Sequence, residues 1–142
     1  MQMDNDLPNP PKAVGNYTTM KRVGDLIYTS GHVPISDDVK YIGKIPKDQS
    51  TEKGYEAASL CAELTLATLS EFYDLKNLTP INVIGFVNCT DDFTEHPNVL
   101  NGFTDKLGEY FETKATRSAV GVSSLPMNVS VEVQTIFYIN KE

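Results

Sequence analysis

The chain has 142 residues, of which 19 are acidic and 12 are lysine or arginine, so its formal net charge is −7. A chain of this length forms one domain and buries roughly two-thirds of its unfolded surface, so it needs neither disulfide nor metal to fold. Lysine and arginine are scattered, and no basic run exists. The acidic balance therefore argues against a nucleic-acid partner, because phosphate binding relies on clustered cations.

The cysteines and histidines do not have the spacing of a metal site. Cys61 and Cys89 form no CxxC pair, and His32 and His96 are far apart in the sequence. We expect buried free thiols in a reducing compartment and no metal. The N-terminus lacks the basic and apolar regions of a signal peptide, and no apolar run reaches the length of a membrane span. A cytoplasmic protein without a membrane partner is the expectation.

The first elements in chain order are predicted to be strands. Residues 1–12 are polar and rich in proline, which favours a flexible N-terminal segment, and a single domain is expected over residues 13–140. Strands at Tyr17–Arg22 and Leu26–Ser30 are predicted to form a hairpin. Gly31 follows, and a glycine at a strand end often marks a place where the backbone approaches a ligand or a neighbouring strand.

A loop is expected over residues 37–49, with a short strand at 40–42 as an alternative. A long helix is predicted over Thr51–Tyr73, with Ser50 as its N-cap. Its buried stripe comprises Ala57, Leu60, Cys61, Leu64 and Ala67. A strand at Ile81–Cys89 is apolar on both faces, which favours a central position in the sheet.

A second helix is predicted over Asn98–Thr113. Its apolar side comprises Leu100, Phe103, Leu107, Tyr110 and Phe111. The order β-β-(β)-α-β-α-β-β predicts an α+β sandwich with both helices on one face of the sheet.

The last two predicted strands carry the candidate chemistry. If residues 123–128 form a symmetric hairpin connection, paired residue numbers sum to 251, and Ala119 lies opposite Glu132. Arg117 and Glu132 are then diagonal neighbours on one face, roughly 7–8 Å apart at the backbone. A guanidinium beside a carboxylate is suited to bind a small acid and to handle water. A partly exposed salt bridge is the alternative that this geometry leaves open.

The sheet face opposite the helices is predicted to be apolar. It would carry Ile136, Tyr138, one side of Ile81–Cys89, Ala119 and Gly121. Such a face favours self-association. Arg117 and Glu132 would then lie near a subunit boundary, and clefts between subunits are common ligand sites.

Five short segments, in order, resemble one known family. They are Ala13–Tyr17, Leu26–Pro34, Asp92–Phe93, Ala115–Pro126 and Val131–Val133. Over about residues 10–139 the chain resembles the RidA/YjgF family of reactive intermediate deaminases. The resemblance implies a chorismate-mutase-like fold with a mixed sheet, and a homotrimer with one cleft per subunit interface. It also implies hydrolysis of 2-imino acids or their enamine tautomers to 2-keto acids and ammonia, without cofactor or metal.

The resemblance also implies roles for individual residues. Arg117 would bind the substrate carboxylate, and Glu132 would position or activate the attacking water. Backbone groups around Gly31 and Ala119 would hold substrate and water. The residues implied to line the pocket are Tyr17, Ser30 and, if a gap is allowed, Asn101.

The chain departs from the family pattern at three places. Ala119 replaces a cysteine that many members carry, His32 replaces a common glutamine, and the loop at 94–97 is longer. These departures concern the choice of substrate more than the type of reaction.

A protein that binds or senses a small carboxylate in the same clefts without turnover is the alternative function. Endoribonuclease activity is a third hypothesis, and the acidic balance argues against it.

Overall fold

The structure, a computed structural model, describes residues 6–141. Its elements in order are β1 (Met20–Val23), β2 (Leu26–Thr29), α1 (Thr51–Ser70), η2 (Leu75–Asn77), β3 (Leu78–Asn88), α2 (His96–Gly108), β4 (Thr116–Val122), η3 (Pro126–Asn128) and β5 (Val131–Ile139). The expected flexible segment falls partly on residues 1–5, which lie outside the described residues. In its described part, Leu7 packs against the core, and the Asn9 amide donates a hydrogen bond to Asp37 at 3.0 Å.

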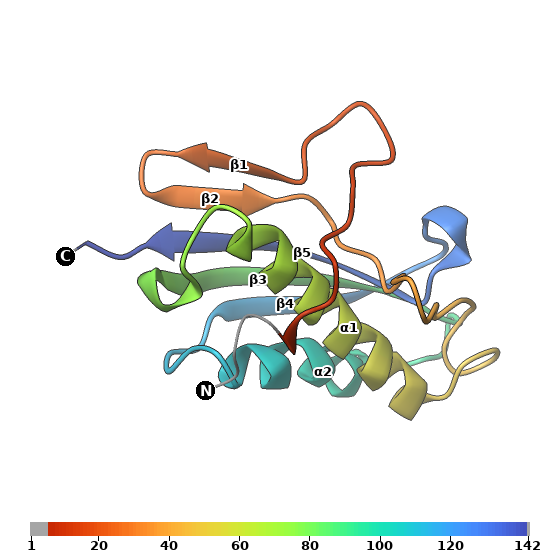
Figure 1. Cartoon of the computed structure of the whole chain (residues 1–142). Helices are drawn as coiled ribbons and strands as arrows, with labels where there is room; N and C mark the ends of the chain where they lie inside the picture. Colours follow the sequence, from red (N-terminus) through yellow and green to blue (C-terminus); the bar gives the residue numbers. More distant parts are fainter. Residues whose placement is uncertain (1–5, 142) are drawn as a thin grey trace.

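One five-stranded sheet organises the domain, in the order β1-β2-β5-β3-β4. Strands β3 and β4 are parallel, and all other neighbouring strands are antiparallel. Helices α1 and α2 lie side by side on one face of this sheet (Figure 1). The predicted α+β class, the layer of two helices and the interior position of the Ile81–Cys89 strand are therefore confirmed.

Both helices begin close to the predicted residues and end earlier than predicted. Ser50 caps α1, because its hydroxyl accepts a hydrogen bond from the Lys53 backbone N–H at 3.1 Å. The predicted apolar stripe of α1 is buried, and so is that of α2. Helix α2 ends at Gly108, yet Tyr110 and Phe111 stay buried because the chain turns back onto the core, where Phe111 packs against Phe137 with ring centroids 5.6 Å apart.

Smaller corrections concern the N-terminal half. Strand β1 begins at Met20, because the chain turns at Tyr17, whose backbone N–H donates to the carbonyl of Gly15. The stretch at 40–42 forms no strand. It makes only isolated bridges, from Lys40 to Ile35 and from Ile42 to Val129.

The predicted hairpin between the last two strands is wrong. Strand β3 lies between β4 and β5, and β4 runs parallel to β3. The connection after β3 contains α2, so β3-α2-β4 is a crossover unit of the kind that parallel strands require. The chain then returns past one strand through η3, where Met127 and Asn128 adopt positive φ values of 58°. Ala119 therefore pairs with Gly85 and not with Glu132.

The face without helices carries large apolar side chains, as predicted, together with the polar Asn82, Ser118, Glu132 and Gln134, and two of its predicted members lie elsewhere. We call it the open face. It carries Tyr28, Ile84, Phe86, Val120, Ile136 and Tyr138. Tyr28 is 45% exposed and Val120 is 43% exposed, so large apolar side chains meet solvent there. Ala119 and Gly121 instead face the helices, because they pair with Gly85 and Val87.

Close packing of the two helices requires glycine at position 102. A Cβ atom at Gly102 would collide with the backbone carbonyl of Tyr55 in α1. Gly102→Ala should therefore lower the free energy of unfolding by about 1–3 kcal/mol, measured by urea denaturation. Gly108→Ala is the matched control in the same helix. Nothing lies within 4 Å of its added Cβ, so stability should stay unchanged or rise by up to about 1 kcal/mol. Equal effects at both positions would contradict this account of the packing.

Candidate functional site

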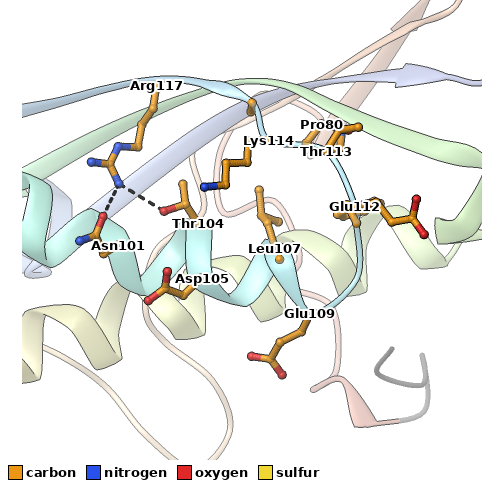
Figure 2. A pocket seen from close by; sticks show the side chains of 13 residues that line it. Pro80, Asn101, Thr104, Asp105, Leu107, Glu109, Glu112, Thr113, Lys114 and Arg117 are labelled. Atoms are coloured by element: carbon orange, nitrogen blue, oxygen red, sulfur yellow. Dashed lines mark hydrogen bonds between the residues drawn. The ribbon is translucent and has the colours of Figure 1, made fainter.

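Arg117 is held in place by helix α2. In β4 it pairs with the buried Val83, so its side chain leaves the sheet on the helix face. Its Nη1 donates to Asn101 Oδ1 at 2.8 Å and to Thr104 Oγ1 at 3.2 Å (Figure 2). Asn101 and Thr104 are three residues apart and therefore share one side of the helix. We call Asn101, Thr104, Arg117 and the neighbouring Ala119 the arginine half-site.

A cavity of about 740 Å³ lies beside Arg117, between β4, α2 and the segment that joins them. Arg117, Asn101 and Thr104 line it, together with residues 107–109 and 111–115. The two hydrogen bonds to α2 use Nη1 and leave Nε and Nη2 as donors. A guanidinium fixed in this way can bind a carboxylate through two parallel hydrogen bonds. The arrangement is suited to a small organic acid.

Glu132 occupies a different surface. It pairs with Phe86 in β5 and faces the open side of the sheet. The backbone of Gly31, just after β2, lies against its carboxylate, and a Cβ at Gly31 would be 2.8 Å from Glu132 Cδ. The close approach expected at Gly31 is thus an approach to Glu132. Burial raises the pKa of the Glu132 carboxyl above its ordinary range. We call Ser30, Gly31 and Glu132 the glutamate half-site.

Ser30 and Tyr17 differ in how firmly they are tied to this half-site. The Ser30 hydroxyl donates to the carbonyl of Thr18 at 2.5 Å, which fixes its direction. Tyr17 is 49% exposed, and its described hydrogen bonds are local, to Val14 and Gly15. The structure therefore places Ser30 beside Gly31 but does not join Tyr17 to Glu132.

His32 supports the glutamate half-site from the core side. The ring is buried, with Nδ1 at 2.8 Å from the carbonyl of Ser30 and Nε2 at 2.8 Å from the hydroxyl of Thr68 in α1. A carbonyl can only accept, so Nδ1 carries the proton, and Nε2 can accept from Thr68. Burial lowers the pKa of His32, which keeps the ring neutral. Its role is to hold the end of β2 against α1.

Arg117 and Glu132 do not meet within one chain. Arg117 pairs with Val83, and Glu132 pairs with Phe86. Because Val83 and Phe86 lie three residues apart on β3, their side chains face opposite sides of the sheet, and so do those of Arg117 and Glu132. They are separated by one strand, about 10 Å across the sheet, and by three residues, about 10 Å along it. The predicted diagonal contact is therefore wrong. The alternative of a salt bridge between them is also wrong, since Arg117 instead binds Asn101 and Thr104.

A thiol–imidazole pair was missed by the sequence reasoning. Cys89 Sγ lies 3.5 Å from His96 Nε2, where β3 ends and α2 begins. Gly121 makes room for the pair, since a Cβ there would be 2.6 Å from His96 Nε2 and 2.8 Å from Cys89 Sγ. No spacing rule in the sequence marks this contact, because it depends on how α2 meets the end of β3.

Among residues 6–141, no three His, Cys, Asp or Glu side chains gather as a metal would require. No helix in that range is long and apolar enough to cross a membrane.

The fold places the protein among α+β domains with two helices on one face of a mixed sheet, and the two half-sites are built on that sheet. Comparison with known proteins gives the family. The family model described as Endoribonuclease L-PSP matches residues 7–139, so the chain belongs to this family, which is the RidA/YjgF family. The resemblance seen in the sequence is thereby confirmed.

Individual relatives cover nearly the whole chain. Protein TCP17 of Trypanosoma cruzi is 30% identical over 94% of this chain and 88% of its own length. TdcF of Escherichia coli, provisionally named a reactive intermediate deaminase, is 29% identical over 89% of this chain and 88% of its own length. The crystal structure of protein Atu1372 from Agrobacterium tumefaciens has a TM-score of 0.85 and 31% identity. It covers 92% of this chain and 86% of that one.

The raised pKa of Glu132 has a consequence for stability. The folded chain keeps a proton on this carboxyl at pH values where the unfolded chain has lost it. The stability that the folded chain gains by holding this proton is fully present below the pKa of Glu132 in the unfolded chain, about 4.3. It is lost as the pH rises through the higher pKa of Glu132 in the folded chain. Glu132→Gln does not ionise, so at pH 7 it should unfold at higher urea concentration than the parent. The gain should stay under about 1 kcal/mol, because solvent screens a half-exposed group. A loss of stability at pH 7 would contradict the sign of the shift.

Proposed function

We propose that this protein hydrolyses 2-imino acids, or their enamine tautomers, to 2-keto acids and ammonia as a homotrimer. The reaction takes place where the arginine half-site of one protomer faces the glutamate half-site of the next. The observation that carries the proposal is the division of the site. A guanidinium fixed for a carboxylate and a carboxylate with a raised pKa occupy opposite faces of one sheet. Only a second copy can bring them together.

Assembly follows from the surfaces that the monomer leaves uncovered. The open face presents large apolar side chains to solvent, including Tyr28 and Val120. Strand β4, which carries Arg117, is an edge of the sheet. A neighbouring copy that covers the open face near Glu132 with its own β4 edge would bury apolar surface and complete the site in one step. The trimer number comes from the family resemblance.

The chemistry needs only positioning and one group that moves protons. Arg117 binds the substrate carboxylate and fixes the C=N bond relative to Glu132. Glu132 accepts a proton from water as its oxygen attacks the imine carbon, and then gives that proton to the nitrogen. It next takes the proton of the new hydroxyl and delivers it to the departing nitrogen as the C–N bond breaks, so a keto acid and ammonia leave and the carboxylate is restored. General acid–base assistance of this kind contributes roughly 10²–10⁴-fold. That is sufficient for an imine, which water already hydrolyses.

Assays of keto-acid binding and of imine hydrolysis also distinguish two other functions. Saturable binding of a keto acid without turnover would indicate a carboxylate-binding or sensing protein that uses the same clefts. The name Endoribonuclease L-PSP raises RNA cleavage as another activity. The net charge of −7 disfavours it, because an RNA substrate is itself a polyanion. We expect any nuclease signal to fall with each purification step while imine hydrolysis stays with the protein.

Substitution of the carboxylate-binding residue should abolish turnover. Arg117→Ala should lower the rate of hydrolysis by about 10²-fold or more, because it removes the bidentate contact that orients the substrate. An amino-acid oxidase generates the imine in the assay, and keto-acid formation is followed. Arg22→Ala is the matched control, since the side chain of Arg22 on β1 donates to the nearby carbonyl of Gly24 and does not line the cavity beside Arg117. An Arg117→Ala variant as active as the parent would overturn the proposed mechanism.

Mixed oligomers test whether the site is shared. Arg117→Ala and Glu132→Gln subunits, each inactive alone, should regain activity when they are co-expressed with different affinity tags and purified as mixed oligomers. In a trimer that contains both kinds of subunit, one of the three interfaces, about a third, would combine an intact Arg117 with an intact Glu132. Assemblies purified separately and mixed without subunit exchange should stay inactive. Mixed oligomers without activity would show that each chain carries its own complete site.

A further inference from the structure

The cavity beside Arg117 contains a second cationic side chain. Lys114 stands in the segment before β4, three residues from Arg117, and its ammonium group points into the space between that segment and α2 (Figure 2). It comes from the same side of the cavity as Arg117, and the two backbone positions are about 10 Å apart or less. Among residues 6–141, no carboxylate lies within 4.0 Å of this ammonium group.

The acidic side chains of the same cavity are engaged elsewhere or turned away. Asp105 accepts a hydrogen bond from the hydroxyl of Tyr55 at 2.6 Å, on the side of α1. Glu109 pairs with Lys106 at 3.1 Å. The carboxylate of Glu112 points away from Arg117 (Figure 2). The lining therefore combines two cations, Arg117 and Lys114, with three carboxylates that are hydrogen-bonded, ion-paired or directed away from Arg117.

The size of the cavity also exceeds what a small imino acid requires. At about 740 Å³ it lies within the range of about 300–1,000 Å³ that is typical of pockets for much larger ligands. A substrate with a short apolar side chain, held by Arg117, would fill only part of it. The neighbouring protomer proposed above would cover part of this space with its glutamate half-site. The part beside Lys114 ends at a cation, which favours a substrate whose side chain ends in an anion.

We propose that Lys114 binds a second carboxylate, so that the preferred substrates are 2-imino acids with an acidic side chain and the products are dicarboxylic 2-keto acids. The proposal rests on the function proposed above and names its substrate class. Arg117 holds the carboxylate next to the reacting carbon, and Lys114 holds the carboxylate at the far end of the side chain. Lys114 is thus a specificity-determining residue that touches substrate but takes no part in proton transfer.

Calorimetric titration with two product analogues tests this assignment. 2-Oxoglutarate carries the second carboxylate, and 2-oxobutanoate does not. The parent protein should bind 2-oxoglutarate about fivefold more tightly, the size expected of one partly exposed charge pair. Lys114→Gln should remove this preference and leave the Kd of 2-oxobutanoate unchanged. Lys114→Arg should keep the preference, and Lys114→Glu should reverse it. Lys53→Gln, which alters an exposed lysine paired with Glu56 on α1, is the matched control.

The outcomes separate this inference from the function on which it rests. Equal affinity for both keto acids in the parent, unchanged in Lys114→Gln, would overturn the assignment of Lys114 and leave imine hydrolysis intact. Failure of the parent to bind either keto acid or to hydrolyse either imine would overturn the proposed function itself. In the parent, KM for the imine generated from glutamate should be about fivefold lower than KM for the imine generated from 2-aminobutanoate. Lys114→Gln should leave kcat for the imine of 2-aminobutanoate unchanged.

Discussion

Strand β3 lies between β4 and β5, and the location of each half of the candidate site depends on this insertion. The parallel pairing of β3 with β4 sends Arg117 toward α2, where Asn101 and Thr104 fix its guanidinium. The antiparallel pairing of β3 with β5 sends Glu132 to the open face. One strand with two different partners thus separates the two charged groups and leaves each at a surface that another copy of the chain can reach.

Each half-site is rigid for a different physical reason. Arg117 is oriented by two hydrogen bonds to side chains on a single helix, so its donors are aligned before any ligand arrives. Glu132 is confined by the backbone of Gly31, and the neutral His32 ties that backbone to α1. The confinement partly desolvates the carboxyl and raises its pKa, which costs stability near neutral pH. In the proposed mechanism Glu132 exchanges protons with water and an imine, and the shift suits that role because it moves the pKa toward the working pH.

Much of the fold was predictable from the sequence, because the signals are local. The Ser50 cap, the apolar stripes of both helices and the apolar character of the open face follow from periodicity that the chain carries in itself. The partner of β4 was not predictable in this way. Alternation in residues 117–122 fits a hairpin with β5 and a crossover to β3 equally well. The choice depends on how α2 packs, which no short window records. Arg117, Glu132 and Gly31 are candidate site residues that the sequence suggested, but their division between two faces was not predictable, because it depends on the same choice of strand partner. The contact of Thr104 with Arg117, the position of Lys114 in the cavity and the Cys89–His96 contact likewise depend on where α2 meets β4 and the end of β3.

The most direct test of the shared site is a crystal structure of the protein grown with 2-oxobutanoate. We expect an oligomer in which the ligand carboxylate is bound by Arg117 of one protomer. Its keto carbon should lie within reach of a water held by the Glu132 carboxylate of the neighbouring protomer. A keto acid bound beside Arg117 with bulk solvent in place of a neighbouring glutamate, or an assembly whose interface leaves the open face bare, would contradict it.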